Sequence, residues 1–357
     1  MKKTIIKKLV AATLAATLIF TGCGSSDGGS SSDSGSAANS GSSSADTGSA
    51  SADAGNDGSL TTVRFGYMTG NIDHLITAVG LEKGIFEKNG IDLKTSEYAA
   101  GINTVDALVM DQIDIGIAAD FAILNRTGNA EQSDVKIIAN YANATGGQLF
   151  ANPETVKDAK DLKGKRIVNL PGVVYEYWNV LAVNNAGLSE GDYEFVNVDS
   201  QPSGVAVATS GDADVFWGSG EVAAQLAALG WKPILTLQEL NAMTTMFFVA
   251  RESYAKDNAE TLKKFYAAIQ ESIDYIQSNT DDAAKIVEAK TGLKQDLFKQ
   301  MLSAYDLGIG FKQATFDYVD GVNKWLKDSN YYKTPFETQD LIFMDAAKEA
   351  YPDKFEL

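Results

Sequence analysis

Apolar residues follow two different periods in the stretch from residue 60 to residue 130. Short, apolar and β-branched stretches bounded by turn residues predict strands at Val63–Tyr67, Ile91–Thr95 and Ile113–Ala118. Apolar residues at helical spacing lie between and after these strands, and they predict helices over residues 75–83, 103–110 and 121–126. Strands and helices that alternate with short connections predict an α/β lobe with a largely parallel sheet.

The same alternation returns further along the chain. A strand is expected at Arg166–Leu170, with a helix directly after it, and residues 256–302 show a long helical pattern. In that pattern Leu262, Phe265 and Ile269 fall on one face and are expected in the core. Beyond residue 60 the chain has roughly 300 residues, which favours two lobes over one core.

The N-terminus has the pattern of an export signal. Four lysines stand before an apolar run, Leu9–Phe20, that is too short to span a bilayer as a stable helix. Gly22 precedes Cys23, the single cysteine of the chain, and this junction resembles a bacterial lipobox, although Phe20 stands where leucine is usual. We therefore expect a lipoprotein signal peptide over residues 1–22 and lipidation at Cys23. The alternative is an ordinary secretory signal with an incidental cysteine.

Residues 24–59 are almost entirely Gly, Ser, Ala, Asp and Asn, so residues 23–59 are expected to form a flexible tether behind the acylated cysteine. The formal charge of the chain is -17, and it becomes about -21 once the four leader lysines are removed. So acidic a protein repels nucleic acid and anionic headgroups, which argues against both as direct partners. The lipid would be its only contact with the membrane.

Several segments, in the same order along the chain, resemble one family of solute receptors. The segment Gly84–Leu93 resembles the "ekGlfekeGldv" segment of the nitrate/sulfonate/taurine-type substrate-binding proteins of ABC importers, a family that includes receptors for pyrimidine precursors. Further similar segments are Asp111–Gly116, Asp161–Val168, Gly211–Trp217 and residues 255–292. Each segment alone is a weak signal, whereas the series covers about residues 62–328.

The resemblance implies a two-lobed periplasmic-binding-protein type II fold joined by two crossover strands, at Gln148–Ala151 and Thr245–Ala250. The first lobe would comprise residues 60–151 and 245–357, and the second lobe residues 152–244. It also implies a monomer, lipid-anchored on the outer face of the cell membrane, that passes a small organic solute to an ABC permease and its ATPase.

Ligands of open α/β sheets collect beyond the carboxyl ends of strands, at helix N-termini. Four loops occupy such positions here, and their candidate ligand-binding residues are Thr69, Asn71, Asp73, His74, Asp120, Tyr175, Glu176, Tyr177, Trp217 and Glu221. The acids among them can instead serve as helix caps, and the aromatic residues can instead pack under their helix.

The third loop departs from the family pattern. Val173 and Val174 stand where the sulfonate-binding branch has hydroxyl residues, and Glu176 adds a carboxylate. Aromatic rings beside acids favour an amine-bearing or heteroaromatic ligand, while an alkanesulfonate such as taurine stays open as the alternative.

Catalysis is not expected. The chain has one histidine and one cysteine, so it has no His/Cys metal cluster and no Ser-His-Asp set, and it lacks a phosphate-binding Gly-x-x-x-x-Gly-Lys motif. No metal and no cofactor is expected. A sensory or adhesive lipoprotein with an inactive cleft is the second class of function that the sequence leaves open.

Overall fold

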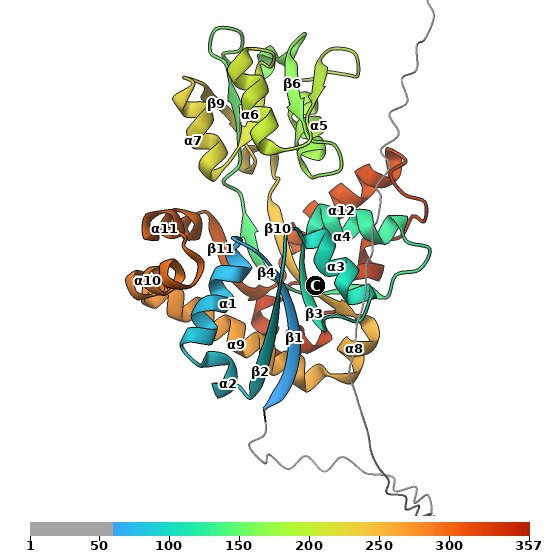
Figure 1. Ribbon diagram of the computed structural model, residues 1–357. Coiled ribbons are helices and arrows are strands. Elements are labelled where there is room, and N and C mark those ends of the chain that lie inside the picture. Colours follow the sequence, from blue (N-terminus) through green and yellow to red (C-terminus); the bar gives the residue numbers. More distant parts are fainter. Residues whose placement is uncertain (1–59) are drawn as a thin grey trace, which may run out of the picture. The chain divides into compact units, whose positions relative to one another are not determined.

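The computed structural model describes residues 60–357, and the leader, Cys23 and the tether lie outside the described residues. Two sheets form the framework of this part of the chain (Figure 1). The first has the order β11-β4-β10-β3-β1-β2, from the strands β1 (Thr61–Met68), β2 (Ile91–Tyr98), β3 (Ile115–Ala119), β4 (Val135–Ala144), β10 (Thr244–Arg251) and β11 (Tyr305–Gly310). The second has the order β7-β6-β8-β5-β9, from β5 (Gln148–Ala151), β6 (Arg166–Asn169), β7 (Glu194–Asn197), β8 (Val215–Gly218) and β9 (Lys232–Thr236).

Helices cover the two faces of the first sheet. One face carries α1 (Ile72–Glu82), α2 (Ile85–Lys88) and α9 (Ala259–Ser278), and the other face carries α3 (Gly101–Val109), α4 (Asp120–Asn129) and α12 (Gln313–Asp328). The second sheet packs with α5 (Tyr175–Asn185), α6 (Gln201–Ser210) and α7 (Gly220–Ala228). The remaining α-helices of the described chain follow β10: α8 (Glu252–Asp257), α10 (Thr280–Thr291), α11 (Gln295–Ser303) and α13 (Asp345–Ala350).

The expected strands and helices of residues 60–130 form with small shifts at their ends, but the expectation of a largely parallel sheet is only partly right. β1 pairs in parallel with β2 and β3, whereas β10 pairs antiparallel with both β3 and β4, and β11 pairs antiparallel with β4. The first sheet is therefore mixed, because a strand returning from the second sheet is inserted between β3 and β4. Local sequence carries no sign of such an insertion.

The expected crossover segments are strands of the two sheets and not the connections between them. Gln148–Ala151 pairs with β8 and β9 inside the second sheet, and Thr244–Arg251 pairs with β3 and β4 inside the first. The connections between the sheets are therefore residues 145–147 and 237–243.

The two sheets share a repeated unit. Apart from the short helix α2, which the second lobe lacks, β1-α1-β2-α3-β3-α4 in the first lobe corresponds to β6-α5-β7-α6-β8-α7 in the second. The strand orders are β2-β1-β3 and β7-β6-β8. The registers agree, since Phe65 pairs with Ile115 and Ile167 pairs with Val215. The packing of helix against strand is also equivalent in the two lobes. In the first lobe the glycine is on the strand, where Gly116 packs against Thr104 of α3, and in the second it is on the helix, where Gly204 packs against Phe216 of β8.

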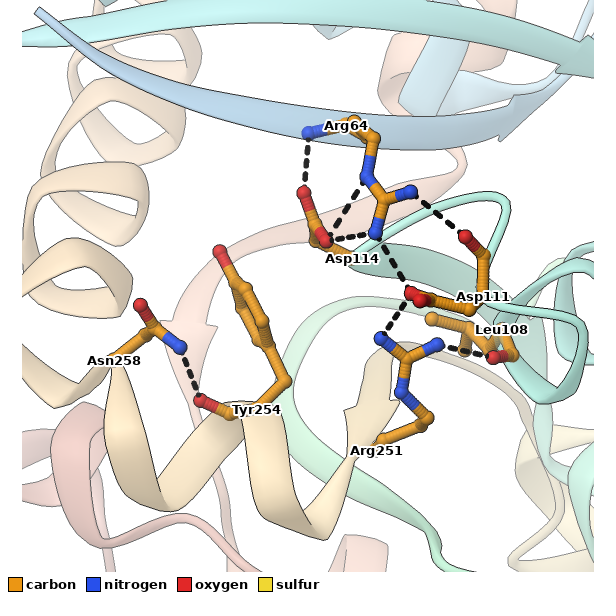
Figure 2. A network of polar contacts seen from close by, with 7 residues as sticks. All are labelled: Arg64, Leu108, Asp111, Asp114, Arg251, Tyr254 and Asn258. Carbon is orange, nitrogen blue, oxygen red and sulfur yellow. Dashed lines mark hydrogen bonds and ion pairs between the residues drawn. The ribbon is translucent and has the colours of Figure 1, made fainter. Parts of the chain in front are cut away.

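An arginine clasp at the start of each unit repeats as well. In Figure 2 Arg64 lies between Asp114 and Asp111; its Nε–Asp114 Oδ1 distance is 3.1 Å and its Nη1–Asp111 O distance is 2.7 Å. In the second lobe Arg166 binds Asp214 in the same way and donates to the carbonyl of Gly211 at 2.8 Å. Asp111 and Gly211 occupy equivalent positions, in the turns before β3 and β8, and both have positive φ values, of 55° and 79°. The segments Asp111–Gly116 and Gly211–Trp217 therefore hold the arginine that lies near the start of each unit.

Arg64→Met and Arg166→Met are each expected to lower the free energy of unfolding by about 2 kcal/mol, because each leaves a mostly buried aspartate without its cation. Because the two clasps lie in separate lobes, the double variant should lose the sum of the two values. Urea unfolding measures the effect, with Lys324→Met, from an exposed i,i+4 pair, as the control. A neutral Arg166→Met beside a costly Arg64→Met would contradict the equivalence of the two clasps.

Candidate ligand-binding site

The carboxyl ends of the parallel strands in both sheets lie next to the connections between the sheets. Ala119, at the end of β3, pairs with Met246 near the start of β10. Gly218, at the end of β8, pairs with Gln148 at the start of β5. The loops after β1, β3, β6 and β8, where the sequence analysis expects ligand contacts, are thus at the ends of the sheets where the chain crosses from one lobe to the other.

The loop after β1 contains four candidate residues. Asn71 caps α1, its Oδ1 accepting from the Ile72 N–H at 2.7 Å. Thr69 donates through its hydroxyl to Glu97 at 3.2 Å. His74 stacks on Tyr67 with ring centroids 4.6 Å apart, and its Nδ1 accepts from the Gly70 N–H. Burial lowers the pKa of His74, which favours the neutral ring.

Asp73 is enclosed beneath this loop. One of its oxygens accepts from the Met68 N–H at 2.8 Å, and among the described residues Oδ1 has no hydrogen-bond partner. The buried hydroxyl of Tyr141 also lacks a partner within residues 60–357. Burial raises the pKa of Asp73 to about 7. A carboxyl in this environment titrates near neutral pH.

Asp120 connects α4 to the strand that returns from the second lobe. Its carboxyl accepts from the Phe121 N–H and, at 2.7 Å, from the Thr245 hydroxyl at the start of β10, and it also accepts from the Thr245 N–H. Its side chain is completely buried, and this burial raises its pKa to about 6. These bonds anchor a crossover strand, which is a structural use of the residue.

The loop after β6 brings residues of α5 against the first lobe. Glu176 accepts from the Tyr331 hydroxyl at 2.5 Å and from the Gly172 N–H at 2.9 Å. Tyr177 packs against Tyr318 and Trp325 of α12, with centroid distances of 6.1 and 5.6 Å. Glu176 and Tyr177 therefore hold the two lobes in contact in this structure.

Tyr175 is buried, accepts from Gln201 at 2.9 Å, and has its pKa raised to about 12 by burial. Trp217 has no exposed surface, and its indole N–H has no partner among the described residues. Glu221 is exposed at the start of α7 and accepts from Gln225 at 3.0 Å.

The candidates thus fall into separate groups. Thr69 and His74 gather around Tyr67 and Glu97, at the ends of β1 and β2. Asp120 and Tyr177 lie near one another. Burial is the main cause that raises the pKa of Tyr177, and the charge of Asp120 is the second. Tyr175 and Trp217 lie in the core, and Glu221 stands apart on α7.

Sequence reasoning passed over Glu97 and Tyr331. Glu97 is exposed and pairs with Tyr67 in the β1–β2 register. Tyr331 belongs to the first lobe, and its hydroxyl donates to Glu176 of the second lobe. Glu97 had a detectable signal, since it is an acid at the end of an expected strand. Tyr331 had none, because only the tertiary fold brings residue 331 to residue 176.

The charge of these loops is one-sided. The stretches 68–74, 97–101, 119–121, 143–148, 170–176, 197–203 and 218–221 contain six carboxylates, Asp73, Glu97, Asp120, Glu176, Asp199 and Glu221, and no lysine or arginine. Within the described residues, no group of three or more His, Cys, Asp or Glu side chains is arranged to hold a metal ion.

A polar cavity of about 480 Å³ lies on the first lobe and meets these loops only at Asn143. Its walls come from β4, β11, α9 and the C-terminal segment, and include Asn140, Gln270 and Asp306. None of the candidate residues lines it.

Comparison with known proteins identifies the family. The model of the family described as "NMT1/THI5 like" matches residues 71–283, more than half of the chain, and the protein belongs to this family. Binding proteins of Brucella abortus (strain 2308) and Brucella melitensis (strain 16M) are each 28% identical over 242 residues, covering 63% of this chain and 70% of theirs.

Solved structures share the fold. The periplasmic aliphatic sulphonate binding protein SsuA of Escherichia coli superposes with a TM-score of 0.68 at 17% identity, over 81% of this chain and 99% of SsuA. SsuA of Xanthomonas axonopodis bound to MOPS gives 0.63 at 15% identity, over 80% and 99% of the two chains. The desulfurization enzyme DszB gives 0.59 at 14% identity, over 82% and 99%. The fold is therefore that of periplasmic binding proteins, and the same fold also occurs in an enzyme.

Proposed function

We propose that this protein is the extracytoplasmic solute-binding lipoprotein of an ABC importer. The observation that carries the proposal is the meeting of two sets of strand ends at the crossovers, where α/β folds bind ligands. Membership of the NMT1/THI5-like family and the shared fold of sulfonate-binding proteins support it. A monomer would close on a small organic solute and pass it to the permease, while the ATPase supplies the energy.

The ligand is proposed to carry an amine or to be heteroaromatic. Six carboxylates without a lysine or arginine in the same loops favour a positive or hydrogen-donating ligand. Thr69, Asn71, His74 and Glu221 are polar side chains of these loops that keep exposed surface. Glu176 and Tyr177 also keep part of their surface exposed but are engaged in contacts between the lobes. The buried candidates would reach a ligand only where a movement of the lobes rearranges their present contacts: Asp73, Asp120, Tyr175 and Trp217.

An alkanesulfonate such as taurine is the second candidate, and one observation favours it. α5 and α7 begin without a side-chain cap hydrogen bond at their N-cap residues, Val174 and Ser219. Free N–H groups at helix N-termini bind oxyanions. SsuA of Escherichia coli is an aliphatic sulphonate binding protein, and SsuA of Xanthomonas axonopodis is bound to MOPS, so both take ligands of this chemistry.

A calorimetric panel of amines, aminated heteroaromatics, amino acids and sulfonates tests the proposal. Saturable binding of one compound class to the purified protein is the expected result. A protein that binds none of them would instead fit a sensory or adhesive lipoprotein, and one that converts a compound without an added partner would be an enzyme.

Anchoring through Cys23 fits this role, because a tethered receptor stays near its permease. Within residues 60–357 no helix is long and apolar enough to cross a bilayer. Lipid labelling of the protein in cells, compared with a Cys23→Ser variant, tests the anchor.

A further inference from the structure

Glu97 occupies a defined place in the candidate site. In the β1–β2 register it lies opposite Tyr67, at the carboxyl end of the edge strand β2. Oε1 accepts from the Tyr67 hydroxyl at 3.1 Å, and Oε2 accepts from the Thr69 hydroxyl at 3.2 Å. Each oxygen keeps acceptor capacity, since a carboxylate oxygen can accept two hydrogen bonds, and the side chain is exposed.

The second lobe supplies an internal comparison for this residue. Counted from the matched registers Phe65–Ile115 and Ile167–Val215, Tyr67 corresponds to Asn169, and Glu97 corresponds to Asn197. Asn169 donates to Asn197 at 2.9 Å, so the same cross-strand hydrogen bond forms there between neutral amides. The repeated unit therefore needs an acceptor at this position but does not need a charge.

The surroundings of Glu97 form a small recognition surface. His74 stacks on Tyr67 with an angle of 13° between the rings. Because His74 Nδ1 accepts from Gly70, Nε2 carries the ring hydrogen of the neutral form and can donate. An anionic acceptor, an N–H donor and aromatic rings thus lie together at the ends of β1 and β2. The pKa of Tyr67 is raised to about 12, first by burial and second by the nearby charge of Glu97. The Tyr67 hydroxyl therefore keeps its proton and donates to Glu97.

We propose that Glu97 is a specificity-determining residue of the site, whose carboxylate accepts a hydrogen bond from an amino group of the ligand. This inference rests on the proposed function and narrows it, because it assigns the amine to the first lobe. A ligand that carries its amine on an unsaturated ring suits the adjoining His74 and Tyr67 best.

Glu97→Gln tests the proposal with matched probes. Calorimetry on the full chain compares 4-aminopyrimidine with pyrimidine, and taurine with ethanesulfonate, since each pair differs by one amino group. The wild type is expected to bind an aminated member at least ~10-fold more tightly, and Glu97→Gln should reduce that affinity about 10- to 100-fold while leaving the other member unchanged. Glu131→Gln, an exposed glutamate outside the loops, is the matched control.

The midpoint of thermal unfolding separates recognition from a structural role. Glu97→Gln keeps an acceptor for Tyr67, as Asn197 does for Asn169, so the unliganded variant should melt with the wild type. Glu97→Asn, which installs the residue of the second lobe, gives a second variant in case glutamine perturbs the strand.

Three results would overturn the inference. In the first, the preference for the amine survives both substitutions. In the second, both members of a pair weaken equally. In the third, a compound binds but neither aminated member binds more tightly than its partner, which leaves the receptor function standing and removes the amine contact. If none of the four probes binds the wild type, the proposed ligand classes fail together with this inference.

Discussion

Asp73→Asn is expected to raise the free energy of unfolding above pH 7, by roughly 2–4 kcal/mol. Asp73 is buried, and its pKa is raised to about 7 from the ordinary value of 3.8. Burial outweighs the hydrogen bond that the ionised carboxylate accepts from the Met68 N–H, so the charged form is disfavoured. Asparagine keeps an acceptor for the Met68 N–H and offers a donor to the unpartnered Tyr141 hydroxyl.

The sign of the pH dependence follows from the same shift. Between about pH 4 and pH 7 the folded protein holds a proton on Asp73 that the unfolded chain has lost. The stability contributed by Asp73 is therefore fully present below pH 4 and is lost as the pH rises through 7. Asp120 acts in the same direction, since burial raises its pKa to about 6.

Urea unfolding of the wild type and Asp73→Asn at pH 4.5 and pH 8 measures the contribution of Asp73, with Asp257→Asn, at an exposed position, as the control. A difference between wild type and variant that is the same at both pH values would show that Asp73 does not titrate in this range.

Phe265→Ala is expected to lower the free energy of unfolding by about 3–5 kcal/mol, the usual loss when a large core side chain is deleted. Phe265 has no exposed surface, and its ring fills the space between its own helix, α9, and the first sheet. Its ring lies 5.3 Å from that of Phe65 and 5.1 Å from that of Phe248, so the cavity would open among large, rigid rings that cannot collapse into it.

Leu297→Ala, on the exposed side of α11, is the control and should change the free energy by less than about 1 kcal/mol. Phe265→Leu should recover part of the loss, because it refills most of the volume. A loss below about 1 kcal/mol for Phe265→Ala would mean that this aromatic cluster is not the centre of the first lobe.

Much of the local structure could be predicted from sequence. The strands at Val63–Tyr67 and Ile91–Thr95 and the apolar face of α9 follow from periodicity alone, because burial of one face imposes it. The segments Asp111–Gly116 and Gly211–Trp217 correctly marked two strands of the fold. Their physical role, which is to hold Arg64 and Arg166, depends on a strand fifty residues away and is visible only in the structure.

The site was harder to predict than the fold. The sequence correctly located helix starts in the loops. It does not distinguish an acid that binds a ligand, as expected for Asp120, from an acid that accepts hydrogen bonds from a neighbouring strand, as Asp120 does from Thr245. Glu176 was expected to face a ligand, and the structure pairs it with Tyr331, which no local pattern connects to it. Glu97 had a signal in the sequence, as an acid at the end of an expected strand, but the argument for its role rests on a comparison with Asn197 that only the strand registers provide.

Small-angle scattering of the purified protein, with and without a saturating amount of the compound that binds it best, tests capture between two lobes most directly. Under the proposed function the two connections, residues 145–147 and 237–243, are the hinges, and a ligand that contacts both lobes would favour the closed form. The expected result is a smaller radius of gyration at saturation. Superimposable scattering curves, while calorimetry shows the site to be full, would contradict capture by closure.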